Sequence, residues 1–191
     1  VATLSAALSL ALAWAIALLQ VRRAAWRGFL SAVSLIGLIL PPAVLATGWF
    51  LLLRGLITGP ASSIILISCL NALMALPFCV TLLTGAISAQ VLPLDRLCAQ
   101  VGLSGWQRFR LIDGPDLMRP LAQAFLMAFV LSFGDLTAIL LLGSQGVITL
   151  PSLIASEMGQ YRAASAQGTA LLLAALCVAG ALLANRLGRR T

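Results

Sequence analysis

The sequence predicts an all-α polytopic membrane protein with five transmembrane helices and one long cytoplasmic loop that folds into two short helices. Three observations lead to this fold class. Of the 191 residues, 61% are apolar and only 9% are charged, against roughly 25% charged residues in a soluble domain. The apolar residues form runs of about 20 residues, the length that a membrane-spanning helix needs. The arginines stand at the ends of these runs, which is typical of a membrane protein with a defined topology.

The five spans follow from the charge-poor runs, taken in chain order. The first run is closed by Arg22 and Arg23, and the third begins after the turn signal at 58–60. The fourth is interrupted only by Asp135. Residues 1–191 are thus expected to form a single transmembrane domain. Its predicted spans are residues 1–21, 28–53, 62–83, 120–142 and 163–185.

The arginines orient these spans, because positive charge marks the cytoplasmic side of a membrane protein. Only Arg54 and Arg162 fall on the external side. The C-terminus is therefore predicted to be cytoplasmic and the N-terminus external. The first residue is Val1, and no basic segment precedes the first run, so we expect the C-terminal part of a longer protein rather than a signal peptide. The ten cytoplasmic arginines are Arg22, Arg23, Arg27, Arg96, Arg108, Arg110, Arg119, Arg186, Arg189 and Arg190.

Prolines interrupt two of the predicted spans. Pro41 and Pro42 lie inside the second span and Pro77 inside the third. Each ring removes a helical hydrogen bond, so we expect a kink or a break at both places. In a membrane such breaks persist where neighbouring helices or a water-lined cavity satisfy the freed carbonyls. Five glycines are expected mainly to permit close helix packing: Gly28, Gly37, Gly48, Gly134 and Gly180.

The loop at 84–119 carries most of the functional information, because a connection of this length is expected to have structure of its own. Apolar residues at 94, 97, 98 and 101 predict a short amphipathic helix that stops at Gly102. Ser104 to Gln107 match a capping box that begins a second helix. That helix presents Trp106, Phe109 and Arg110, and it ends over 112–115, with Pro115 suited to the first turn of the fourth span.

Two interpretations of this helix pair stay open on the residues alone. One is a helix pair on the membrane surface with Trp106 at the lipid headgroups. The other is a docking element for a cytoplasmic protein, since aromatic and arginine side chains together are typical of interface hot spots.

The external side offers two further features. Asp135 is the one acid inside a predicted span, and such a charge must face the bundle interior or a cavity. It either hydrogen-bonds backbone near a broken helix, which we favour, or lines a translocation path; the fourth span could also end early and leave Asp135 near the external interface. Pro151 suits the first turn of a short helix between the last two spans, which is a simple connection, a re-entrant segment or an external surface for a periplasmic protein.

The composition excludes several classes of function. The sequence contains no lysine and no histidine, which removes a Walker A loop, a Ser-His-Asp triad and a histidine-ligated metal site. The four cysteines form no C-x-x-C pair and are expected to be small buried thiols. The net charge of +7 reflects membrane topology rather than binding of nucleic acid. We therefore predict no catalytic residue, no metal and no cofactor.

The loop around Gly102 resembles the signature loop of the permease subunits of ABC importers. That family pattern is Glu-Ala-Ala, three residues, Gly, nine residues and Ile-x-Leu-Pro. Gly102, Ile112 and Pro115 fit its spacing. Two positions depart from it, because the Glu-Ala-Ala positions read Arg-Leu-Cys over 96–98 and Gly114 stands where the family has Leu.

A more extensive resemblance, to the second half of the permeases of thiamine ABC importers, covers nearly the whole chain. It implies a type I importer fold in the bacterial inner membrane, and import of thiamine or its phosphates. The partners implied are a cytoplasmic ATPase dimer that hydrolyses the ATP, a periplasmic substrate-binding protein and a second permease half, within membrane lipid. The segments that carry the resemblance are LPPAVLATGWFLLL (40–53), NALMALPF (71–78), LCAQVGLSGWQRFRLIDGPDLMRPLAQA (97–124) and VLSFGDL (130–136).

The resemblance gives the loop residues a role in coupling to the ATPase, whereas Asp135, Pro41 and Pro42 are the candidates for the substrate path. The alternatives are import of another solute, such as ferric iron or an inorganic anion, or a membrane scaffold without transport. An intramembrane enzyme is disfavoured by the missing lysine and histidine. The predicted coupling residues are Gly102, Trp106, Phe109, Arg110, Ile112 and Pro115.

Overall fold

The computed structural model of the chain describes residues 1–39, 41–53, 59–94, 98, 100, 102, 107, 114–135 and 149–188. The regular elements of this part are all helical, and four of its helices are long and apolar enough to cross a membrane. A π-helical turn and a 3-10 turn continue α4 toward the predicted loop. The elements are α1 (Ala2–Arg22), α2 (Ala24–Ile39), α3 (Pro42–Leu53), α4 (Pro60–Ala86), η1 (Ile87–Val91), η2 (Leu92–Leu94), α7 (Gly114–Phe133), α9 (Leu150–Gly159) and α10 (Ala163–Gly188).

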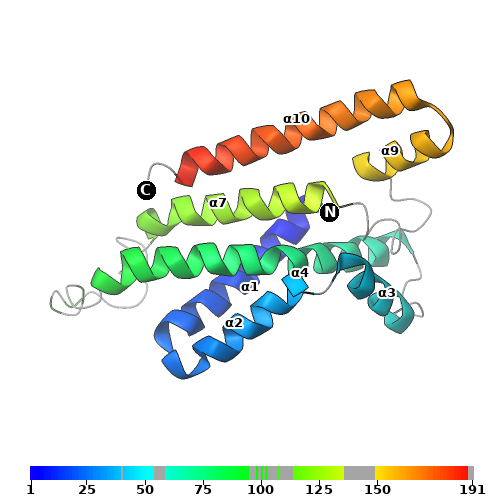
Figure 1. Ribbon diagram of the computed structural model, residues 1–191. Coiled ribbons are helices and arrows are strands. Elements are labelled where there is room, and N and C mark those ends of the chain that lie inside the picture. Colours follow the sequence, from blue (N-terminus) through cyan, green and yellow to red (C-terminus); the bar gives the residue numbers. More distant parts are fainter. Residues whose placement is uncertain are drawn as a thin grey trace.

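Helices α1, α4 and α7 form the centre of the bundle and contact one another pairwise. As Figure 1 shows, α2 returns alongside α1, α10 lies along α7, and the short α9 folds back on α10. α4 extends beyond the ends of α1 and α7, toward α3. The side chains of the bundle centre are therefore drawn from segments far apart in the sequence.

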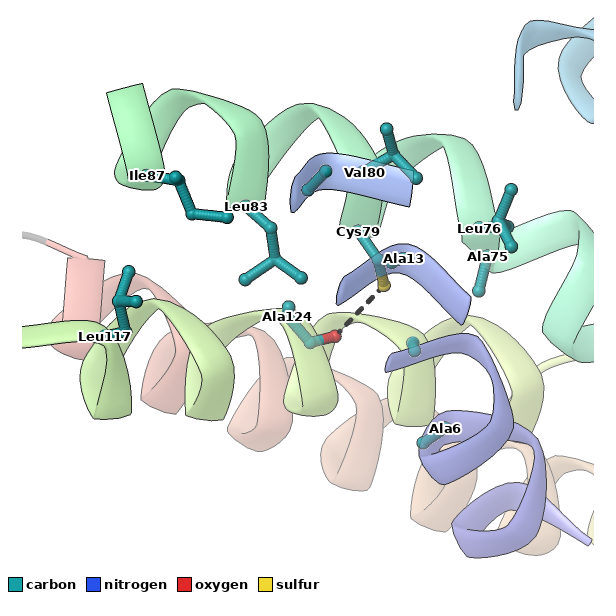
Figure 2. Packing of buried hydrophobic residues seen from close by; sticks show 12 residues of the cluster. Ala6, Ala13, Ala75, Leu76, Cys79, Val80, Leu83, Ile87, Leu117 and Ala124 are labelled. Atoms are coloured by element: carbon teal, nitrogen blue, oxygen red, sulfur yellow. Dashed lines mark hydrogen bonds between the residues drawn. The ribbon is translucent and has the colours of Figure 1, made fainter. Parts of the chain in front are cut away.

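The core is built from small side chains, which let the helix backbones approach closely. α1 contributes alanines and serines at intervals of three or four residues, including the fully buried Ala6, Ala13 and Ala17. Larger residues of α4 fill the remaining space, among them Leu83, and Figure 2 shows them facing α1 and α7 around Cys79. All four cysteines are free; Cys79 and Cys98 are buried, whereas the two others are only half-buried, contrary to the expectation of four buried thiols. Those two are Cys69 and Cys177.

The second predicted span is two helices rather than one. α2 has 16 residues and α3 has 12, so neither reaches the length of about 20 residues that a span needs. The separation at Pro41 and Pro42 confirms the predicted break. Pro77 behaves differently, because α4 runs through it without interruption. Two adjacent rings remove two successive backbone donors and end the helix, whereas one ring is accommodated.

The remaining spans shift their boundaries. α4 begins at Pro60 and ends at Ala86, which extends the predicted 62–83 at both ends. α7 occupies Gly114–Phe133 instead of 120–142. It begins earlier because Pro115 sits in its first turn, as expected from the fixed φ of proline. It ends earlier, just before Gly134, where an asparagine of α4 bonds to one of its last carbonyls, as described below. α10 begins at residue 163, as predicted.

Close glycine packing is confirmed at one of the five positions. A Cβ added to Gly180 would lie 2.6 Å from Cγ2 of Val130, so α10 and α7 meet there through a glycine. Gly28 and Gly48 have no neighbour within 4 Å of such a Cβ, and Gly134 meets only a carbonyl of its own preceding turn, at 3.9 Å. The close-packing prediction is therefore wrong for these three. The surroundings of Gly37 lie outside the described part of the chain.

Candidate functional site

Of the six predicted coupling residues, the structure describes Gly102 and Pro115. Gly102 is exposed and has φ +75°, in the left-handed region that favours glycine. No atom of the described residues lies within 4 Å of an added Cβ, so the backbone conformation is the reason that the described structure gives for glycine here. Trp106, Phe109, Arg110 and Ile112 lie outside the described residues. Within the two predicted loop helices, the described positions 98, 100 and 107 are helical.

The start of α7 presents the last residue of the predicted coupling set. Pro115 is exposed in the first turn, and Asp116 follows it. A carboxylate in the first turn is favourable, because the N-terminal end of a helix carries partial positive charge. Leu117 points the other way and is 1% exposed. The first turn of α7 thus anchors itself in the core while it leaves Pro115 and Asp116 on the surface.

The two prolines proposed for the substrate path form the junction between α2 and α3. Both are exposed. The carbonyl of Pro41 accepts hydrogen bonds from the backbone N–H groups of Val44 (3.0 Å) and Leu45 (3.3 Å). This carbonyl therefore starts α3, and Pro42 occupies the first helical position, where a missing N–H costs nothing. Pro41 and Pro42 therefore form the regular N-terminal turn of α3.

Asp135 lies beyond the helix in which it was predicted. It is half-buried and follows Gly134, two residues after α7 ends. The early end of the fourth helix was one of the outcomes considered from the sequence. The carboxylate therefore sits at a helix terminus and not within a regular span.

A buried polar cluster, missed by the sequence analysis, joins three helices just before Asp135. The Asn71 amide of α4 donates from Nδ2 to the Ser132 hydroxyl (2.9 Å) and to the Ser132 carbonyl (3.4 Å) of α7. The Ser5 hydroxyl of α1 lies 2.6 Å from the Ser132 hydroxyl. All three side chains are at most 5% exposed. Because the last carbonyls of a helix lack partners within it, Asn71 acts as a cap supplied by another helix.

Two polar atoms beside this cluster have no hydrogen-bond partner within the described part of the chain. They are Oδ1 of Asn71 and the hydroxyl of Ser68, one turn earlier on α4. Their burial separates them from any path that would need solvent access. A single asparagine inside the apolar run of 64–83 was the signal that the sequence offered, since polar side chains in spans commonly bond to neighbouring helices.

Two further sets of polar contacts, nearer the C-terminal end of α4, join this helix to its neighbours. Cys79 lies 3.5 Å from the Ser9 hydroxyl of α1 and donates from Sγ to the carbonyl of Ala124 in α7, also at 3.5 Å (Figure 2 shows the latter). Thr84 donates to the side-chain carbonyl of Gln20 at 3.0 Å. Along these contacts, the residue numbers of α1 and α4 increase in the same direction, whereas those of α7 decrease. The first two helices are therefore parallel and the third is antiparallel, as expected for an alternating path through a membrane.

The short helix predicted after Thr149 is present as α9. The side chains of Thr149 and Ser152 cap each other's backbone N–H groups, and Pro151 lies in the first turn, as predicted. At the other end, Glu157 accepts a hydrogen bond from Thr169 of α10 at 2.8 Å. α9 is therefore held along the first turns of α10.

Comparison with known proteins places these features in a family context. Residues 7–191 match the family described as "Binding-protein-dependent transport system inner membrane component". The thiamine transport system permease protein ThiP of Brucella abortus (strain 2308) is 42% identical over 158 residues, which cover 83% of this chain and 29% of that protein. ThiP of Haemophilus influenzae is 38% identical over 183 residues, or 93% of this chain and 34% of that protein.

A third relative gives the same result. ThiP of Escherichia coli (strain K12) is 36% identical over 171 residues, which cover 89% of this chain and 32% of that protein. The chain thus spans about a third of the length of the curated relatives it matches. No solved structure matches it.

Proposed function

Because the chain belongs to the family of inner-membrane components of binding-protein-dependent transport systems, we propose that it is the permease part of an ATP-driven importer for thiamine or its phosphates. The choice of thiamine as the substrate rests on the 36–42% identity to three thiamine permeases over 83–93% of the chain. The polytopic helical bundle supports the membrane role.

The proposed partners are a cytoplasmic ATPase dimer, a periplasmic substrate-binding protein and a second permease half. The chain has no lysine for a Walker A loop, so the ATPase subunits supply hydrolysis. Binding of ATP by those subunits would favour one of two packings of the bundle, and a loaded binding protein would favour the packing that accepts solute. The part of the loop around Gly102 is the proposed contact with the ATPase.

The proposed orientation has the C-terminus in the cytoplasm and the N-terminus of the chain in the periplasm. It is supported by the ten arginines on one side and by the alternating directions of α1, α4 and α7. In this orientation α9 and the ends of α7 and α3 face the periplasm.

Uptake by proteoliposomes tests the function. The full permease, its ATPase and the loaded binding protein are expected to accumulate labelled thiamine only when ATP is supplied on the ATPase side. Thiamine phosphates, ferric iron and inorganic phosphate serve as competing solutes. Stimulation of the ATPase by another loaded binding protein, with no response to thiamine or its phosphates, would contradict the substrate while leaving the transporter class intact.

The coupling role of Gly102 has its own test. Val is strongly disfavoured at positive φ, whereas Asn tolerates it. A penalty of about 1–2 kcal/mol for a left-handed residue with a bulky side chain predicts roughly tenfold weaker association of the ATPase with Gly102→Val. Gly102→Asn should copurify the ATPase as the wild type does. Equal copurification by the two variants, with normal membrane insertion, would show that this residue does not position the contact.

A further inference from the structure

A groove of about 340 Å³ lies between α9 and the first turns of α10, within the range of about 300–1,000 Å³ that is usual for ligand pockets. Its walls are Ile154 and Met158 of α9, Ala163, Ala166 and Ala170 of α10, and Tyr161 between the helices. The hydrogen bond from Thr169 to Glu157 (2.8 Å) holds the two helices together behind it. The groove is thus mainly apolar, with Gln167 as its further polar member.

The position of the groove relative to the membrane follows from α10, which is one of the four helices able to span it. Ala163 begins the helix and Ala170 lies seven residues further on, so the groove descends about 10 Å along it at 1.5 Å per residue. That depth takes it from the interface into the hydrocarbon region. Within α10, the described side chains that are buried are only Ala166 and Ala184, so the helix exposes its apolar surface around the groove.

Tyr161, which lines the groove, is followed in the sequence by a cation, Arg162. Tyr161 is 96% exposed and has φ +57°, a backbone conformation that is uncommon for a bulky residue. Arg162 is exposed and lies between two of the lining residues. No carboxylate of the described residues forms an ion pair with it, and the nearby Glu157 is hydrogen-bonded to Thr169. Tyrosine and arginine at the start of a span are typical of the headgroup level.

We propose that this groove binds one anionic phospholipid of the adjoining leaflet, with an acyl chain against Met158 and Ala170 and the phosphate at Arg162. The arginine guanidinium suits a phosphate because its fork of N–H donors can bond two oxygens at once. The apolar depth of the groove favours a lipid over a water-soluble binding protein, because the latter does not enter the hydrocarbon region. The lipid would fix α9 against α10 at the side where α7 ends.

Photocrosslinking tests the proposal on the assembled transporter in nanodiscs. The probes are phosphatidylglycerol and phosphatidylcholine that carry a diazirine in one acyl chain, and mass spectrometry maps the crosslinks. We expect crosslinks within residues 150–170, with phosphatidylglycerol preferred. Loss of a charge-assisted hydrogen bond predicts about tenfold less phosphatidylglycerol crosslinking for Arg162→Gln, and Arg162→Lys should retain part of it.

Matched variants separate the groove from the general lipid contact of α10. Ala170→Phe should fill the groove and abolish its crosslinks, whereas Ala175→Phe, on the same helix outside the groove, should leave them unchanged. Arg186→Gln at the other end of α10 is the charge control. Wild-type crosslinking by both Arg162→Gln and Ala170→Phe would overturn the proposal. Unchanged crosslinks together with weaker affinity for the periplasmic binding protein in Arg162→Gln would also overturn it and assign the surface to that protein. The readout is bound lipid, so the result does not depend on the solute transported.

Discussion

At the scale of single residues, small polar side chains join the apolar helices of this bundle. Ser132 is the most connected of them, since it meets both Ser5 and Asn71. Between transmembrane helices the driving force is packing and hydrogen bonding rather than the hydrophobic effect, because lipid is as apolar as the core. A few buried hydroxyls and one amide can therefore determine which faces of the helices meet.

The cluster around Ser132 gives the first prediction. Ser132→Ala removes the hydroxyl that links α1, α4 and α7, and it leaves the Asn71 amide with only a 3.4 Å carbonyl contact. Measured hydrogen bonds between membrane helices average about 0.6 kcal/mol with a maximum near 1.7, so a loss of about 1 kcal/mol in the free energy of unfolding is expected. Titration with a denaturing detergent measures it. Ser156→Ala, which removes an exposed hydroxyl within α9, is the control. If the two variants lower the free energy of unfolding equally, the buried cluster makes no special contribution to stability.

Asp135 gives the second prediction. A carboxylate at the bilayer centre costs about 2.5–3.5 kcal/mol on insertion scales, whereas one just beyond a helix end can bond to backbone. We expect Asp135→Asn to assemble normally and to retain most of its uptake, because the amide keeps the shape and much of the hydrogen-bonding capacity. Vesicle uptake of labelled thiamine measures this. A well-assembled variant without transport would instead place the charge on the substrate path.

At the scale of elements, prolines decide where helices continue. Pro77 is buried inside an uninterrupted α4, while Pro41 and Pro42 separate α2 from α3. The difference is that a single missing N–H can be absorbed by a slight bend, whereas adjacent rings remove two hydrogen bonds and clash with the preceding turn.

This contrast predicts the outcome of removing the pair. Replacing both residues in a Pro41→Ala, Pro42→Ala double variant should join α2 and α3 into one helix. Spin labels at the exposed positions Val33 and Phe50 would then approach the separation of about 26 Å that 17 residues of straight helix give. Pulsed electron paramagnetic resonance measures the distance against the wild type, with Pro77→Ala as the control that should not change it. An unchanged distance in the double variant would mean that packing, not proline, separates the helices.

The contact between α7 and α10 gives the fourth prediction. A Cβ on Gly180 would lie 2.6 Å from Val130 Cγ2, so Gly180→Ala should cost about 1–3 kcal/mol of unfolding free energy by overpacking. Val130→Ala in the same chain should restore part of it, because the two residues share one space. Gly168→Ala, where no atom lies within 4 Å, controls for glycine replacement on the same helix. If Gly168→Ala and Gly180→Ala behave alike, the close approach does not determine stability.

At the scale of the whole molecule, the helix directions and the arginines support one topology. Hydrogen bonds make α1 and α4 parallel and α7 antiparallel, and Figure 1 shows α10 running back along α7. By sequence position, ten of the 12 arginines belong to the segments predicted for the side where α1, α4 and α10 end. Charge and chain direction thus agree, although each rests on a different physical property.

Cysteine labelling checks the topology. In a background with all four native cysteines replaced by alanine, Gln107→Cys should react with a membrane-impermeant maleimide only from the cytoplasmic side. Gln160→Cys should react only from the periplasmic side. Both positions are exposed, and the cysteine-free background must stay unlabelled. Labelling of Gln107→Cys from the periplasm would reverse the proposed orientation.

The sequence by itself determined the features that depend on local patterns. Runs of about 20 apolar residues require helices in a membrane, because only a helix satisfies its own backbone there. The proline pair, the start of α7 near Pro115 and the cap of α9 at Thr149 were predicted from residue type and spacing. The left-handed conformation of Gly102 likewise follows from residue type and position. Its coupling role and those of the neighbouring residues stay predictions.

Only the tertiary structure decided which faces of these helices are buried and where α7 ends. α1, α4 and α10 have no strongly apolar face set against a polar one, so the pattern along the sequence does not separate a face that meets lipid from one that meets another helix. The polar cluster depends on Ser5 and Ser132, which are 127 positions apart. Its third member, Asn71, donates to the Ser132 carbonyl at the end of α7, where the apolar run alone would have continued the helix. A contact between distant segments, and not local hydropathy, therefore fixes that end and leaves Asp135 outside the helix.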